Sequence, residues 1–398
     1  MAYLGGSMAI CEQCGRALTA SDGTCATCGA AQVRAGSEEP ERTRPASSTR
    51  RLSVAGVAFA VAGLLLFVYV VWNADVAKIY ADLRRLGAGF LVILLLSGFR
   101  FAVRALAWTL CFEAPHRLRF RDAFRAYLTG DAVGNIVPLG IVVSEPAKAA
   151  LVRERVPLVA GLSAIAVENI FYSLSVALFV SSGAVALLWS FELSRVQRWV
   201  NISVLLGTGA VLMFGFAMVA MQWKILSGAL ERLYARGVAR RLLETGRVRV
   251  RSLEERVYGF YRNNQRRFLP ILLLEACFHA AGVAEAYVTL YFVNGEPPGL
   301  LAAFILESVN RVINVVFKFV PLRVGVDEAG TGKTTQLLQL GATVGVTLAI
   351  VRKARMLCWT GVGVGLLVAR GLSVREVAEQ AARAKSPKAK ELEMMSNR

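Results

Sequence analysis

Four cysteines near the N-terminus have the spacing of a metal site. Cys11, Cys14, Cys25 and Cys28 form two Cys-x-x-Cys-Gly motifs separated by ten residues. Each motif can turn tightly enough to direct two thiolates at one tetrahedral Zn²⁺. Disulfides are the competing interpretation, but the cytoplasmic side on which we expect this segment is reducing. Because four thiolates leave no open position for a catalytic water, the pattern predicts a structural zinc ribbon over residues 1–30.

A second stretch, "AGTGKTT" at 329–335, is similar to a phosphate-binding loop. Such a loop needs a glycine at the position that Asp327 occupies, because its backbone N–H groups must surround the phosphates. A carboxylate there would repel them. The preceding segment has a helical pattern, and the next 18 residues, Thr334 to Val351, carry no charge and are long enough to enter a membrane. The stretch therefore predicts no nucleotide site and needs another explanation.

That explanation is an internal repeat. "VPLGIVVSE" begins at Val137 and "VPLRVGVDE" begins at Val320, so Pro138 and Glu145 correspond to Pro321 and Glu328, with an offset of 183 positions. Each copy is followed by about 36 mostly apolar residues, the first of them Val156 to Phe191 and the second Thr334 to Ala369. Proline breaks a membrane helix and frees backbone groups that can line a polar cavity, which is a feature of transporters.

Charged side chains lie beside both breaks. Glu145 and Glu328 each lie seven positions after the proline, and Asp327 lies next to Glu328. A carboxylate at membrane depth usually faces a cavity or a cationic partner. The candidate partners are Lys148 and Arg153 in the first copy, and Arg323 and Lys333 in the second. The alternative is that both segments are ordinary cytoplasmic loops with exposed charges.

Further charges interrupt the apolar segments themselves. Arg100 and Arg104 share one helix face, cannot neutralise each other, and need an acidic partner or an anionic ligand such as a lipid phosphate. Snorkelling to the membrane surface is the alternative for them. Glu307 and Arg311 are four residues apart and can pair with each other. The remaining charges lie near the middle of the two apolar blocks that follow the breaks: Glu168 in the first, and Arg352, Lys353 and Arg355 in the second.

The elements that must position these residues are membrane helices. Hydrophobic residues make up 55% of the 398 residues and are gathered in blocks. Uncharged runs at Leu52–Ala74, Asn169–Phe191 and Trp199–Trp223 are each long enough to cross a hydrocarbon layer about 30 Å thick. Four further apolar segments contain isolated charges: 86–112, 268–295, 297–320 and 334–369. The sequence predicts an all-α polytopic membrane protein with six to eight spans and two Pro-broken repeat segments.

The net charge of +18 is unevenly distributed along the chain. Residues 224–267 carry 12 Lys and Arg against 4 Asp and Glu, whereas the short loops at 192–198 and 294–298 carry almost none of the excess. This asymmetry predicts a multi-pass protein of the plasma (inner) membrane whose N-terminus, 224–267 loop and tail are cytoplasmic. Attraction to anionic lipid explains the basic residues, and nucleic acid is not required. The expected domains are the ribbon (1–30), a flexible linker (31–51), the membrane domain (52–370) and a basic cytoplasmic tail (371–398).

Two segments carry a family resemblance. The first segment is "GNIVPLGIVVSEPAKAALVR", from Gly134 to Arg153. The second has the pattern Pro-x-x-x-Gly-x-x-Glu from Pro321, followed by an apolar helix that reaches Arg355. Both resemble the flippase-like family that includes the transmembrane region of lysylphosphatidylglycerol synthases. The resemblance covers about residues 52–370 and implies movement of a lipid or lipid-linked molecule between leaflets. Only about thirty polar residues follow, so we expect no aminoacyl transfer and no enzyme activity of that kind.

The leading hypothesis is therefore a lipid flippase whose partners are anionic or phosphate-bearing lipids. Two alternatives stay open: a membrane-embedded transferase that acts on a lipid carrier, with Glu145 or Glu328 as the base, and a scaffold whose zinc ribbon recruits a cytoplasmic protein.

Overall fold

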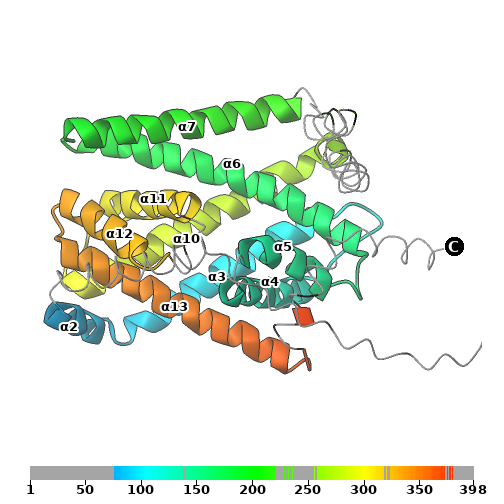
Figure 1. Ribbon diagram of the computed structural model, residues 1–398, viewed down its shortest axis with the longest axis horizontal. Coiled ribbons are helices and arrows are strands. Elements are labelled where there is room, and N and C mark those ends of the chain that lie inside the picture. The colour runs from blue at the N-terminus through cyan, green and yellow to red at the C-terminus, as the bar shows by residue number, and fades with distance from the viewer. Residues whose placement is uncertain are drawn as a thin grey trace, which may run out of the picture. The chain divides into compact units, whose positions relative to one another are not determined.

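The computed structural model describes residues 76–137, 140–220, 258–317, 320 and 323–372, and isolated positions at 228, 232, 235, 255, 374, 376, 377 and 379. This part of the chain is helical and contains no strand (Figure 1). Its elements are α2 (Val76–Leu86), α3 (Gly89–Leu110), α4 (Phe120–Ile136), α5 (Gly140–Leu151), α6 (Leu158–Ser190), α7 (Arg195–Ala220), the 3₁₀ turn η1 (Gln265–Arg267), α10 (Phe268–Asn294), α11 (Leu300–Val316), α12 (Val326–Leu337) and α13 (Ala342–Val368). The predicted all-α class is confirmed for these residues.

Several of these helices suit a membrane. Four segments among the described residues are long and apolar enough to cross one: Gly89–Leu110, Leu158–Ser190, Arg195–Gly215 and Gln265–Asn294. The 27 residues of α13 span about 40 Å, which is also sufficient, but charged residues interrupt them. The predicted first span, 52–74, the zinc ribbon, the linker and most of the 224–267 loop lie outside the described residues. The total of six to eight spans therefore stays a prediction.

The internal repeat is visible as a repeated succession of helices. The first break separates α4 from α5, and the second separates α11 from α12. Adding the offset of 183 to the bounds of α3, α4 and α5 brings each within four residues of α10, α11 and α12, and the start of α6 falls one residue before α13. Pro138 and Pro321 lie outside the described residues, while Val137 is extended, as expected before a proline. A repeat recognised from nine residues thus extends over four helices.

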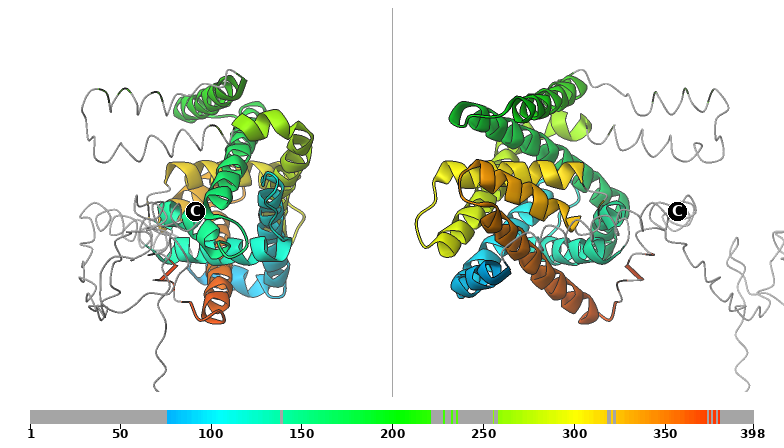
Figure 2. Two further views of the ribbon diagram at one scale, coloured as in Figure 1. Left: turned by 90° about the vertical axis from the view of Figure 1, so that its right-hand side faces the viewer. Right: turned by 60° about the vertical axis from the view of Figure 1, so that its left-hand side comes forward.

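The two repeats have opposite orientations. Figure 1 shows that α3 and α10 run in opposite directions, as do α6 and α13, and that the α4–α5 and α11–α12 pairs lie toward opposite ends of the bundle. Figure 2 shows the same arrangement from two other sides. α4 of the first repeat packs against α13, the last helix of the second repeat, and α11 of the second repeat packs against α6, the last helix of the first. Inverted repeats of this kind are found in many secondary transporters.

Glycines allow close approach at both of these contacts between repeats. A Cβ atom on Gly183 of α6 would lie 1.9 Å from the Ser308 hydroxyl of α11. A Cβ atom on Gly363 of α13 would lie 2.6 Å from the carbonyl oxygen of Leu128 on α4. Small residues let membrane helices pack with their backbones close together, which strengthens dispersion contacts. The α4–α13 and α6–α11 contacts therefore depend on the absence of a side chain at these two positions.

One sequence-based boundary is wrong. The segment 334–369, expected to be a single apolar block, is divided between α12 and α13, because Gln339 and Gly341 adopt positive φ angles of 59° and 86° that end one helix before the next begins. The "AGTGKTT" stretch lies wholly inside α12 and not in a loop, and Lys333 is exposed on it. A helix interior cannot wrap its N–H groups around phosphates, so this stretch does not have the geometry of a phosphate-binding loop.

Candidate functional site

The most charged part of the interior is a group that we call the central arginine cluster. It consists of four arginines and two glutamates from four helices: Arg100 on α3, Glu285 on α10, Glu307 and Arg311 on α11, and Arg352 and Arg355 on α13. Both glutamates are buried, and so are Arg100 and Arg311. The cluster thus joins α3 of the first repeat to α10, α11 and α13 of the second.

Glu307 is the centre of the cluster. Its Oε1 pairs with Arg311, as the i, i+4 spacing predicts, and lies 3.7 Å from Nη2 of Arg100. Its Oε2 accepts a hydrogen bond from Nη2 of Arg352 at 3.2 Å and another from the Asn310 amide at 3.1 Å. Glu285 completes the arrangement. It accepts a hydrogen bond from Arg100 Nη1 at 2.8 Å and pairs with Arg355.

The charges of this cluster do not balance. Four guanidinium groups face two carboxylates, which leaves two positive charges in excess. Nη1 of Arg352 is buried and has no hydrogen-bond partner among the described residues. An uncompensated charge in a low-dielectric interior is costly unless a ligand or solvent meets it. The cluster can therefore accept an anion, and the planar, permanently charged guanidinium suits phosphate oxygens in particular.

An aromatic ring lies beside two arginines of the cluster and a third arginine outside it. The guanidinium carbons of Arg100, Arg311 and Arg104 lie 4.4, 4.9 and 5.6 Å from the centroid of Phe278 on α10. Cation–π attraction favours this placement, especially where water is excluded. Phe278 thus offsets part of the mutual repulsion of three arginines without neutralising any of them.

Arg104 has a partner of its own. Its Nε lies 2.6 Å from Oε1 of Glu168 on α6, its Nη2 donates to Oε2 of the same carboxylate at 3.0 Å, and its guanidinium carbon is 3.7 Å from the Tyr172 ring. Arg104 and Glu168 are both buried. Arg100 and Arg104 therefore use acidic partners, and the snorkelling alternative does not apply to either.

The two carboxylates that follow the helix breaks are both paired, but in different ways. On α5, Glu145 Oε1 accepts a hydrogen bond from Lys148 Nζ at 2.8 Å, whereas Arg153 is exposed. On α12, Glu328 Oε1 accepts one from Lys353 of α13 at 2.6 Å, and Arg323 lies 3.4 Å from Asp327 instead. Of the four cations proposed as partners of these glutamates, Lys148 alone is confirmed.

Sequence reasoning did not single out three residues of α10 that lie in or beside this network, and it missed the role of a fourth residue. Glu275, Glu285 and Phe278 lie on α10, and Lys353 was noted for its charge but not as a partner of Glu328. The signal for the two glutamates was present, because an acidic residue inside an apolar segment such as 268–295 normally faces the protein interior.

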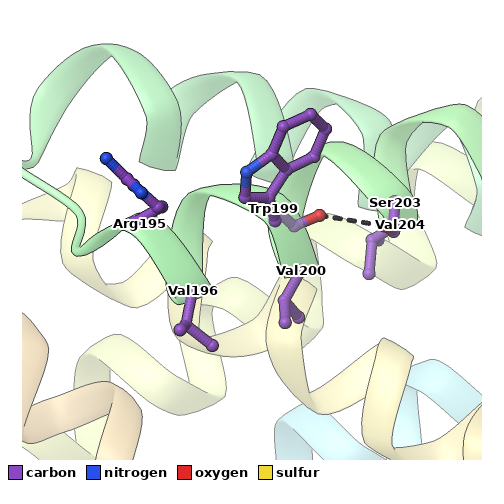
Figure 3. Close-up of a pocket in the computed structure, with 6 residues that line it drawn as sticks. All are labelled: Arg195, Val196, Trp199, Val200, Ser203 and Val204. Carbon is purple, nitrogen blue, oxygen red and sulfur yellow. Dashed lines mark hydrogen bonds between the residues drawn. The ribbon is translucent and has the colours of Figure 1, made fainter.

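A separate apolar hollow lies on the first turns of α7 (Figure 3). Its lining residues all belong to this helix: Arg195, Val196, Trp199, Val200, Ser203 and Val204. Trp199 is 65% exposed, and the Ser203 hydroxyl donates within the helix to the Trp199 carbonyl at 2.9 Å. On a candidate span such a surface suits contact with lipid tails. None of its lining residues belongs to the central arginine cluster.

Comparison with known proteins bears on the same helices. The family described as the lysylphosphatidylglycerol synthase TM region matches residues 53–365. The chain belongs to this family. No curated protein and no solved structure matches it. The resemblance carried by the two Pro-containing segments is thereby confirmed. The family match begins after the four N-terminal cysteines, so it leaves the zinc ribbon a prediction.

Proposed function

We propose that this member of the lysylphosphatidylglycerol synthase TM region family moves a phosphate-bearing lipid, or a lipid-linked molecule with such a head group, between the two leaflets. The observation that carries the proposal is the excess of two positive charges in the central arginine cluster. A lipid phosphodiester brings one negative charge, so its binding reduces the imbalance. The acyl chains can stay in lipid against the exposed apolar residues of the outer helices, among them Leu95, Trp199 and Met213.

The inverted repeat supports transport over covalent chemistry as the function. Two helix hairpins at opposite ends of the bundle can open toward opposite sides of the membrane, as alternating access requires. The proposed function makes and breaks no covalent bond, so we propose a transporter and not an enzyme. Transport also gives the Glu328–Lys353 pair a role, since this pair holds α12, the short helix after the second break, against α13. The Glu145–Lys148 pair lies within α5.

The distribution of charge supports the orientation. The segments 111–119, 152–157 and 262–267 lie at the end of the bundle where α3 ends and where α6 and α10 begin. This end carries the arginines Arg117, Arg119, Arg121, Arg153, Arg155, Arg262, Arg266 and Arg267. We propose that it faces the cytoplasm of a plasma (inner) membrane and that residues 191–195 lie outside. We further propose that the N-terminal ribbon holds a structural Zn²⁺ and offers a surface to a cytoplasmic protein.

Arg352 offers a sharp test. It is a surplus cation, because Glu307 keeps Arg311 and Arg100 when Arg352 is removed. Arg352→Gln should therefore fold and melt in detergent like the wild type. Losing one charge-assisted hydrogen bond to a phosphate, about 1.5–3 kcal/mol, should nevertheless slow lipid movement by about tenfold or more.

The assay follows fluorescent phospholipids in reconstituted vesicles, in which an impermeant reductant reports the outer leaflet. Lys333→Gln, on the exposed side of α12, is the matched control and should keep the wild-type rate. A wild-type protein that moves no phosphate-bearing lipid, or an Arg352→Gln variant with full activity, would contradict the proposal.

A further inference from the structure

One buried acidic residue takes no part in the ion pairs described above. Glu275 on α10 has an exposed fraction of 0%, and neither of its carboxylate oxygens has a hydrogen-bond partner among the described residues. An ionised carboxylate in that position would lose its hydration and gain no hydrogen bond in return. A carboxylic acid avoids most of this cost because it is neutral.

The charged groups around Glu275 are already committed elsewhere. Arg104 of α3 and Arg311 of α11 are the cations whose fields reach it, and they are bound to Glu168 and Glu307. Glu168 of α6 adds a negative charge near Glu275. Cys111 and Tyr127 are further titratable groups in its electrostatic environment. Glu275 therefore lacks a counter-ion of its own and has a second carboxylate as a neighbour.

The remaining elements packed against α10 supply no free cation to Glu275 within the described residues. Arg352 and Arg355 of α13 contact Glu307 and Glu285, and Arg267 of η1 donates to the Leu110 and Phe112 carbonyls. On α2, Asp82 accepts a hydrogen bond from Thr347, and the cations Lys78, Arg84 and Arg85 are exposed. One turn farther along α10, the Nε2 atom of His279 lies 3.1 Å from the Ser175 hydroxyl.

We propose that Glu275 is a proton-binding site, occupied in this conformation, and that its proton crosses the membrane together with the anionic head group. A proton is the ion that fits, because it needs no space beside a side chain with no exposed surface. An ammonium group or a metal ion would need both room and further oxygen ligands. The proton is taken from water and returned to water, and no other bond changes.

Arg311 connects this site to the central arginine cluster. Its guanidinium carbon lies 4.9 Å from the ring centroid of Phe278, three residues after Glu275 on α10, and it pairs with Glu307. An anion bound to the cluster repels an ionised Glu275 and therefore favours the neutral acid. By linkage, a protonated Glu275 favours the anion to the same extent. One phosphodiester and one proton together carry no net charge, which lowers the cost of crossing the bilayer. This coupling rests on the proposed lipid movement, whereas the proton site itself does not.

The occupancy of the site can be measured without transport. Infrared difference spectra between the wild type and Glu275→Gln at neutral pH should contain the carbonyl band of a protonated carboxylic acid, with the usual shift in D₂O. Glu192→Gln, an exposed control, should give no such band. Because the glutamine replaces a neutral group of nearly the same shape, the variant should also melt like the wild type. Absence of the acid band in a folded Glu275→Gln difference spectrum would overturn the proposal.

Coupling is tested in reconstituted vesicles by exchange of a fluorescent anionic phospholipid with equal pH on both sides. Above the titration midpoint the wild-type rate should fall by up to about tenfold per pH unit, as for any step that needs one bound proton. Glu275→Gln imitates the protonated state, so its rate should change by less than about twofold over the same range. A variant that keeps the wild-type pH dependence would overturn the coupling but not the lipid transport. A wild type inactive at every pH would instead overturn the proposed function, and the infrared result would still decide the proton site.

Discussion

Lys353 of α13 donates a hydrogen bond to Glu328 of α12 at 2.6 Å, and the same carboxylate closes the start of its own helix. Oε2 of Glu328 accepts a hydrogen bond from the N–H of Gly325 at 2.8 Å, while Oε1 receives Lys353. Gly325 has a φ of 82°, a conformation that few other residues adopt readily. A single fully buried side chain therefore fixes the turn after the second break and holds the short helix against α13.

Replacing Glu328 by glutamine should separate these two roles. The amide can still cap the helix, but Lys353 loses its strongest partner and keeps only Asp327, at 3.4 Å. Removing one member of a buried ion pair typically lowers the free energy of unfolding by about 3–5 kcal/mol. Because Lys353 keeps its contact with Asp327, we expect a loss of about 3 kcal/mol or less. The melting temperature in detergent and the rate of lipid movement should both fall.

Lys333→Gln on the same helix is the control for this substitution. Its Nζ makes one exposed contact, 3.2 Å from the Gln336 side chain, so neither stability nor activity should change. ATP analogues should also leave the melting temperature of the wild type unaltered, because residues 329–335 are helical. Saturable nucleotide binding that Lys333→Gln abolishes, or wild-type behaviour of Glu328→Gln, would contradict this account.

The pair of Arg104 and Glu168 provides a second prediction, on the contact between α3 and α6. Arg104→Met leaves a buried carboxylate without its partner and should cost about 3–5 kcal/mol. The double variant Arg104→Met, Glu168→Met replaces both charges by apolar groups and should recover most of that loss in chemical denaturation. If the double variant is no more stable than either single variant, the pair is not the source of the effect.

Activity of the same double variant distinguishes structural from functional roles. A purely structural pair predicts that lipid movement returns together with stability. A pair that also contacts the head group predicts a stable but slow protein. Either result can be measured in the fluorescent-lipid assay with matched amounts of folded protein.

The ion pairs also indicate how far sequence reasoning reaches. Glu307 with Arg311 and Glu145 with Lys148 are local pairs, four and three residues apart on one helix, and helical geometry alone brings them together. Arg100 pairs with Glu285, 185 positions away. That contact requires α3 and α10 to pack against each other, and periodicity contains no information about which helices become neighbours.

The second break illustrates the same limit at shorter range. Arg323 and Lys333 were the cations closest in sequence to Glu328, yet its partner lies 25 positions away on the next helix. The turn at Gln339 and Gly341 brings α13 back along α12, and this turn lies within an uncharged run that gave no sign of a helix end. The repeat itself was recognisable, because proline and glutamate recur at one offset, but its inverted orientation is a property of packing.

The proposed orientation predicts which loops are accessible from outside an intact cell. Arg153 precedes α6 and Glu192 follows it, so these two exposed residues lie beyond opposite ends of that helix. In a background without Cys111, Cys277 and Cys358, an impermeant maleimide should label Glu192→Cys and not Arg153→Cys. The physical reason is that the basic end stays in the cytoplasm. Labelling of Arg153→Cys before the cells are opened would reverse the orientation.

The contact between α4 and α13 predicts opposite outcomes for two glycines on one helix. A Cβ atom at Gly363 would lie 2.6 Å from the Leu128 carbonyl oxygen and from Ala132, so Gly363→Ala must push backbone apart and should lower the melting temperature and lipid movement together. At Gly365 nothing lies within 4 Å, and Gly365→Ala should be neutral or slightly stabilising, by up to about 1 kcal/mol, because alanine favours the helix. Thermal unfolding in detergent measures both. Since the two positions are two residues apart on α13, a general effect of alanine on this helix would change both variants equally. Equal melting temperatures of Gly363→Ala and Gly365→Ala would therefore show that the repeats do not meet at Gly363.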